Sequence, residues 1–91
     1  FTSEMRVKIK VLYFASLREK LGMHAEEIEL PAGVATVAAL RGHLRARGGN
    51  YEHAFSEKAL LRAAVNQDMV QPAAAVKAGD EVAFFPPVTG G

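Results

Sequence analysis

The sequence predicts an α+β domain in which a mixed sheet of four to five strands is covered by one main helix and short helical turns. Three observations carry this prediction. Two early segments alternate apolar and charged residues, a later segment repeats apolar residues at helical spacing, and the last apolar run ends at paired prolines. A period of two is typical of strands and a period of three to four is typical of helices, while proline ends a strand because it has no amide hydrogen.

The first predicted strand covers residues 6–13, where apolar and basic residues alternate and therefore lie on opposite faces. A second strand over residues 26–30 alternates in the same way and ends at Pro31-Ala32-Gly33, so we expect it to pair with the first strand like a hairpin. Between them, residues 16–21 predict a short helical turn. It stops at Gly22 because glycine readily takes the left-handed conformation that follows a helix end.

The main helix is predicted over residues 36–47, with Thr36 as its N-cap. Its apolar face is formed by residues at spacings of three and four, namely Val37, Leu40 and Leu44. The polar stretch that follows, residues 50–58, predicts a loop or a short helical turn. We expect it to carry Tyr51 and Phe55 back to the core.

Residues 61–67 predict a third strand, followed by a turn at Gln67-Asp68 and a short return strand over residues 69–71. Residues 81–85 predict the last strand, which Pro86-Pro87 terminates. The order is strand, strand, helix, strand, short strand, strand. This order is typical of the β-grasp fold, in which the first and last strands pair in parallel across a helical crossover.

Alternation also sorts the side chains at the end of the last strand. Val82 and Phe84 are predicted to face the helix-covered core, and Phe85 the opposite side. Phe85 would then be an exposed aromatic residue beside the chain end, suited to a partner's pocket. The alternative is that loops bury both phenylalanines. Phe14 and Leu17 are predicted to be core residues rather than interface residues.

The length of 91 residues suits a single domain, which we predict over residues 5–85. Residues 1–4 precede Met5 and are interpreted as a cloning remnant. Residues 86–91 are interpreted as a flexible C-terminal tail, and this name is kept for them below. The chain contains no cysteine, which excludes disulfides, thiolate metal ligands and a nucleophilic thiol.

The charge balance and the hydropathy pattern exclude two further classes of partner. Eleven basic and ten acidic residues nearly cancel, and no long basic run is present, so we do not expect nucleic acid binding. No apolar stretch is long enough to span a bilayer and no signal-peptide pattern is visible, so we expect no membrane association and a cytoplasmic location.

The tail carries no helix or strand pattern, and its two prolines favour an extended backbone. Its members are Pro86, Pro87, Val88, Thr89, Gly90 and Gly91. Six residues reach roughly 20 Å, enough to enter another protein's active site, and glycines without Cβ atoms fit a narrow channel. A terminal Gly-Gly pair by itself also fits simple disorder or a cloning remnant. The β-grasp pattern that precedes it favours a functional chain end.

The run over residues 80–91, Asp-Glu-Val-Ala-Phe-Phe-Pro-Pro-Val-Thr-Gly-Gly, resembles the ending of the small subunits of molybdopterin synthase. Residues 11–15, 17–19 and 64–67 are also similar to that family, and the resemblance extends over residues 5–91. The thiamine-pathway carrier and ubiquitin share only the fold and the Gly-Gly end. The two phenylalanines followed by Pro-Pro-Val-Thr-Gly-Gly distinguish the chain from both.

The resemblance implies a sulfur-carrier subunit that is not a catalyst on its own. It implies that an E1-like activating enzyme uses ATP to adenylate the carboxylate of Gly91, and that sulfur from a donor then replaces AMP to give a thiocarboxylate. It further implies that the tail enters the large catalytic subunit, in a heterotetramer of two small and two large subunits, and donates sulfur to cyclic pyranopterin monophosphate. No permanently bound cofactor is implied.

Arg18 matches a family position that contacts partner proteins, although a solvated surface charge is the alternative. The three histidines, His24, His43 and His53, lack the spacing of metal ligands, and we assign them no role. Two other functions stay open from the sequence. One is a carrier for another sulfur pathway, such as thiamine synthesis or tRNA thiolation. The other is a protein-modifying tag joined to a lysine through Gly91, which the residues preceding Gly90 disfavour.

Overall fold

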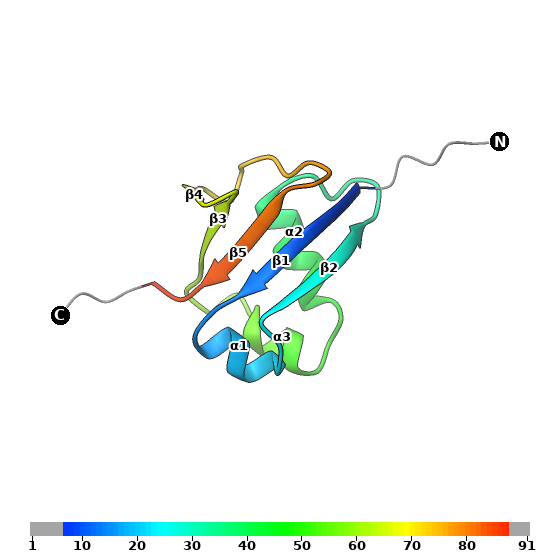
Figure 1. Ribbon diagram of the computed structural model, residues 1–91. Helices are drawn as coiled ribbons and strands as arrows, with labels where there is room; N and C mark the ends of the chain where they lie inside the picture. Colours follow the sequence, from blue (N-terminus) through cyan, green and yellow to red (C-terminus); the bar gives the residue numbers. More distant parts are fainter. Residues whose placement is uncertain (1–6, 88–91) are drawn as a thin grey trace.

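The computed structural model describes residues 7–87, which form a five-stranded mixed sheet in the order β2-β1-β5-β3-β4. Helix α2 crosses one face of the sheet, and α1 and α3 lie together at one end (Figure 1). The strands are β1 Val7–Tyr13, β2 Ala25–Leu30, β3 Arg62–Val65, β4 Asp68–Val70 and β5 Glu81–Phe85. The helices are α1 Ser16–Leu21, α2 Val37–Arg45 and α3 Asn50–Ala54. The predicted α+β class is therefore confirmed.

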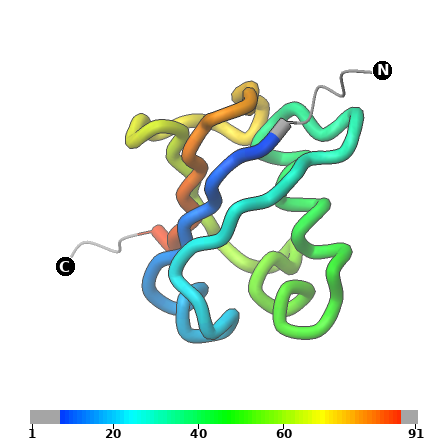
Figure 2. The backbone as a smooth tube through the Cα atoms, turned by 45° about the vertical axis from the view of Figure 1, so that its right-hand side comes forward, coloured from blue at the N-terminus to red at the C-terminus, as the bar shows by residue number. Residues whose placement is uncertain are grey.

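The first and last strands lie side by side in the middle of the sheet, as Figures 1 and 2 both show. They run parallel, with Tyr13 opposite Phe84. Strand β2 pairs antiparallel with the outer side of β1, and β3 pairs antiparallel with β5 so that Arg62 lies opposite Phe85. Both the hairpin-like pairing of the first two strands and the parallel pairing of the first and last are confirmed.

Helix α2 begins where the sequence predicts, because the Thr36 hydroxyl accepts a hydrogen bond from the Ala39 amide at 3.1 Å. The carbonyls of Ala74 and Pro72 accept from the next two free amides, those of Val37 and Ala38, at 3.0 and 2.8 Å. The helix ends at Arg45, earlier than the predicted residue 47. For residues 50–58 the sequence allowed either a loop or a short helical turn, and the structure has helix α3 there.

The turn between β3 and β4 lies one residue earlier than the sequence predicts. Asn66 and Gln67 are its central residues, and their φ angles of 52° and 74° give the two left-handed positions of a tight hairpin. The Asn66 amide group donates to the buried Asp80 carboxylate at 3.0 Å, and the Glu81 amide donates to the Asn66 side-chain oxygen at 3.0 Å. These contacts tie the hairpin to the start of β5.

The core lies between the sheet and the helices. Phe55 stacks edge-on against two buried rings, with centroid distances of 6.1 Å to Tyr13 and 5.2 Å to Phe84. The predictions that Val82 and Phe84 face inward and that Leu17 is buried are confirmed. No helix within residues 7–87 is long and apolar enough to cross a membrane.

The prediction that Phe14 is a core residue is wrong, since 47% of its surface is exposed. Phe14 follows directly after Tyr13, the last residue of β1, and its amide donates to the Phe84 carbonyl at 3.2 Å. It therefore continues the strand by one position. Alternation then turns its side chain away from the face that Tyr13 occupies.

Candidate functional site

The described chain leaves the sheet at the end of β5. Phe85 is the last residue of the strand, and Pro86 and Pro87 follow it. All three are partly buried, so Phe85 lies on the predicted face but is less exposed than expected. The other predicted site residues, Val88, Thr89, Gly90 and Gly91, lie outside the described residues, and their roles stay predictions.

The face of the sheet opposite α2 carries an apolar row that crosses all five strands. Leu12 on β1 pairs with Ala25 on β2 and with Ala83 on β5. Ala83 in turn pairs with Ala64 on β3, and Ala64 pairs with Met69 on β4. We call these five residues the apolar row. No helix of residues 7–87 covers them (Figure 1).

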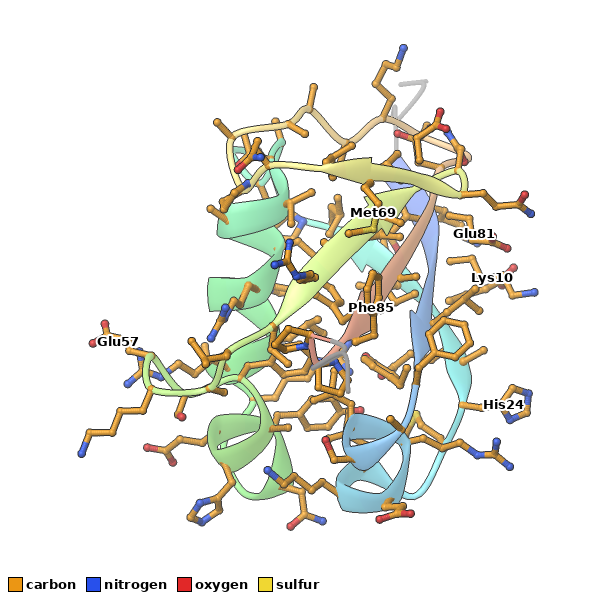
Figure 3. The ribbon with its side chains drawn as sticks, turned by 90° about the vertical axis from the view of Figure 1, so that its left-hand side faces the viewer. Lys10, His24, Glu57, Met69, Glu81 and Phe85 are labelled. Atoms are coloured by element: carbon orange, nitrogen blue, oxygen red, sulfur yellow. The ribbon has the colours of Figure 1, made fainter. Side chains whose placement is uncertain are left out.

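Within this row Met69 is 58% exposed. A larger apolar side chain borders the row at the end where the chain leaves the sheet, because Phe85 follows Ala83 by two positions on β5 and therefore shares its face (Figure 3). Phe14 continues β1 at the same end. Of these side chains Phe14 and Met69 are exposed, Ala64 is buried and the others are partly buried. A partly exposed apolar surface that no described helix covers favours contact with another molecule. The candidate site is thus a docking face beside the base of the tail.

Charged residues bound the other end of the same face. Lys10 lies between two carboxylates, with Glu27 opposite on β2 and Glu81 opposite on β5. Lys8 lies opposite Glu29. Opposite charges in cross-strand pairs favour the register and stay in water. The docking face therefore has an apolar part near the tail and a polar part away from it.

Arg18 is exposed on the short helix α1, which fits both the predicted partner contact and the alternative of a solvated surface charge. It lines an open pocket of about 350 Å³ together with Leu12, Tyr13, Phe14 and His24. This pocket adjoins the apolar row through Leu12. The structure thus brings Arg18 to the rim of the candidate site, while its contact with a partner stays a prediction.

A carboxylate with three hydrogen-bond donors lies on the other face of the sheet, on β2. Glu26 accepts hydrogen bonds from Tyr13 at 2.7 Å, Tyr51 at 2.8 Å and Arg47 at 3.0 Å. Burial alone would raise the pKa of the Glu26 carboxyl, but these three donors outweigh it and hold the pKa below the ordinary glutamate value. Because all three contacts hold the carboxylate in place, Glu26 stabilises the fold and is not arranged as a general base.

Residues 7–87 contain no group of three or more histidine, cysteine, aspartate or glutamate side chains placed to hold a metal ion. The described part of the site offers apolar contacts beside the point where the chain leaves β5. Its arrangement suits binding, with any chemistry left to the tail and to a partner.

Sequence reasoning missed three surface apolar residues, of which Met69 and Leu60 are exposed and Leu12 is partly buried. Strand alternation places Leu12 and Met69 on the face opposite α2, once the register of β1 and β4 is known. Leu60 is 77% exposed and precedes β3 by two residues. No periodic pattern covers Leu60, so the sequence held no signal for it.

Comparisons with known proteins agree with this arrangement. The ThiS family model matches residues 11–91. A molybdopterin synthase sulfur carrier subunit of Haemophilus influenzae is 47% identical over 83 residues, which cover 91% of this chain and 99% of that protein. The protein of the same name from Escherichia coli is 49% identical over 83 residues, which again cover 91% of this chain and 99% of that protein.

A solved structure described as molybdopterin converting factor, subunit 1, from Pyrococcus furiosus has the same fold. Its TM-score is 0.75 at 38% identity, and the match covers 90% of this chain and 99% of that one. The match to the family model extends over the apolar row and the tail. The chain therefore belongs to the ThiS family.

Proposed function

We propose that this chain is the sulfur carrier subunit of molybdopterin synthase and that the carboxylate of Gly91 carries the sulfur. The observation that supports this most strongly is the 47–49% identity to two curated carriers over nearly their whole length. The sequence ends in the Gly-Gly pair that this chemistry requires.

In the proposed cycle the Gly91 carboxylate attacks the α-phosphorus of ATP on an activating enzyme, which releases pyrophosphate and forms an acyl adenylate. A reduced sulfur nucleophile then attacks the carbonyl carbon and expels AMP, which leaves a thiocarboxylate. Carboxylate oxygen is a poor leaving group, and adenylation converts it into a good one. Two such deliveries to cyclic pyranopterin monophosphate supply both sulfurs of the dithiolene.

The folded part of the chain has a binding role in this proposal. The apolar row, Phe14 and Phe85 dock on the large catalytic subunit, and the tail then extends from Pro87 into that subunit's active site. Arg18 adds a charged contact at the rim. The large subunit supplies the acid and base groups, which agrees with a docking face made of apolar side chains.

Reconstituted molybdopterin synthesis with purified large subunit, activating enzyme, ATP and a sulfur donor tests the proposal. Deleting Gly91, or adding one alanine after it, is expected to reduce molybdopterin formation to background. The terminal acyl group would then no longer lie at the reacting position in the active site of the large subunit. Thermal unfolding of both variants should match the unaltered chain. A matched control that lacks residues 1–4 should keep full activity.

Product formation by either tail variant at the unaltered rate would refute the assignment of Gly91. The other two candidate functions give different results in the same mixture. A carrier for another pathway would be thiocarboxylated without yielding molybdopterin, and a protein tag would appear in conjugates of higher mass.

A further inference from the structure

We propose that Leu60, held in place by Arg41, is a second anchor for the large catalytic subunit, separate from the apolar row. This inference rests on the proposed function, since it names a further contact for the protein that receives the tail. Leu60 is 77% exposed, more than Phe14 or Met69, which makes it the most exposed large apolar side chain among residues 7–87.

The position of Leu60 follows from the sheet register. Arg62 lies opposite Phe85 in the antiparallel pair of β3 and β5. Leu60 precedes Arg62 by two residues, and Pro87 follows Phe85 by two. Leu60 and the base of the tail are therefore at the same end of the sheet, with Leu60 on the β3 side and Phe14 on the β1 side. A protein that encloses the tail meets both.

Residues 56–60 have no regular secondary structure, yet Arg41 holds them from α2. Its guanidinium donates to the Ser56 carbonyl at 2.6 Å and to the Ala59 carbonyl at 2.7 Å. Hydrogen bonds from a charged donor are about twice as strong as neutral ones. The Ala59 amide also donates to the Ser56 carbonyl at 3.0 Å, which closes the turn directly before Leu60.

An exposed leucine on a fixed segment is suited to binding in a way that one on a loose loop is not. Ordering a loop on association costs free energy, and a segment that is already held avoids most of that cost. Anchors of this kind insert into apolar pockets of the partner. The expected counterpart is thus an apolar pocket on the large subunit beside the channel that takes the tail.

The test measures the Kd of the full chain for the large subunit by calorimetry. Leu60→Ala is expected to weaken binding about tenfold. Its thermal unfolding should not change, because the truncated side chain lies in water. Lys58→Ala is the matched control on the same segment, since Lys58 is also exposed, and should bind as the unaltered chain does.

Arg41→Met tests the positioning role, since methionine keeps an unbranched apolar side chain but removes the Nη2 donor of both hydrogen bonds. It should weaken binding by less than Leu60→Ala, and the double variant should bind no more weakly than Leu60→Ala alone. If the two losses multiply instead, Arg41 does not act through Leu60 and that part of the proposal is wrong.

Unchanged affinity of Leu60→Ala would overturn the anchor. So would a loss of self-association, in place of a loss of large-subunit binding, because the occupant would then be a second copy of the chain. If the unaltered chain itself fails to bind the large subunit, the proposed function fails first and the anchor fails with it.

Discussion

Glu26 shows how single residues hold this small domain together. Its carboxylate accepts from Tyr13 on β1, from Tyr51 on α3 and from Arg47 just after α2. The Arg47 guanidinium also lies 5.0 Å from the centre of the Tyr51 ring. Burial, followed by the bond to Glu26, raises the pKa of the Tyr13 hydroxyl well above its ordinary value, so this donor stays protonated.

Replacing this carboxylate gives a prediction with a defined pH dependence. The folded-state pKa of Glu26 is depressed, so its stabilising effect is complete above the unfolded pKa near 4.3 and is lost as pH falls through the folded value. Glu26→Gln should therefore lower the free energy of unfolding by about 1–2 kcal/mol at pH 7. Urea unfolding at pH 7 and pH 3 should show this difference shrinking in acid.

The exposed neighbour Glu27 provides the control for that measurement, and Glu27→Gln should change stability little at either pH. A Glu26→Gln effect of equal size at both pH values would contradict the account, because it would mean that the charge of the carboxylate contributes nothing.

At the scale of the elements, the parallel pair β1 and β5 forms the centre of the proposed docking face. It puts Leu12 and Ala83 side by side at the middle of the apolar row, and β3 extends the row through Ala64. Small residues in three of the five positions keep this face flat. A flat apolar face of which Met69 is the most exposed member would need no change in the fold to meet a partner's side chains.

Ala83→Glu tests this face directly. A carboxylate in the middle of the apolar row would lose its hydration on docking without gaining a partner, so affinity for the large subunit should fall more than tenfold. Thermal unfolding should change little because Ala83 is only partly buried. Calorimetric titration measures the first quantity and circular dichroism the second.

Ala73→Glu introduces the same charge in an exposed loop and is the matched control. Equal affinities for the two variants would show that the apolar row is not the docking face.

The sequence predicted the elements well because their signals are local. Alternation located the strands, spacing located α2, and Thr36 located its start. The errors have local causes too. Phe14 reads as a core residue because it continues an apolar run, but it also continues β1, and alternation after the buried Tyr13 turns it outward. The turn was misplaced by one residue because Asn66 is followed by Gln67, a residue with no special preference for left-handed backbone.

The candidate site was less accessible from sequence than the fold. The tail is a contiguous motif that the sequence shows directly, and its role stays a prediction. The apolar row joins one residue from each of five strands, and its register depends on pairings between segments far apart in the chain. Leu60 becomes a candidate only through its exposure and through the Arg41 contacts, which no periodic pattern encodes.

Across the whole molecule, binding and chemistry are assigned to different parts. The sheet and helices form a stable support, one sheet face is the proposed docking face, and the described chain leaves β5 through Pro86 and Pro87 at one end of that face. This division explains how a chain without cysteine can serve as a sulfur carrier. The reactive sulfur would be held by the main-chain carboxyl group and not by a side chain.

Intact-mass spectrometry of the chain tests this most directly, after incubation with the activating enzyme, ATP and a sulfur donor. The account predicts a gain of about 16 Da, the difference between a sulfur and an oxygen atom, confined to the C-terminal peptide. Without ATP the mass should not change. An unchanged mass in the complete mixture, or a gain located on any peptide that lacks Gly91, would contradict the claim that this chain end carries sulfur.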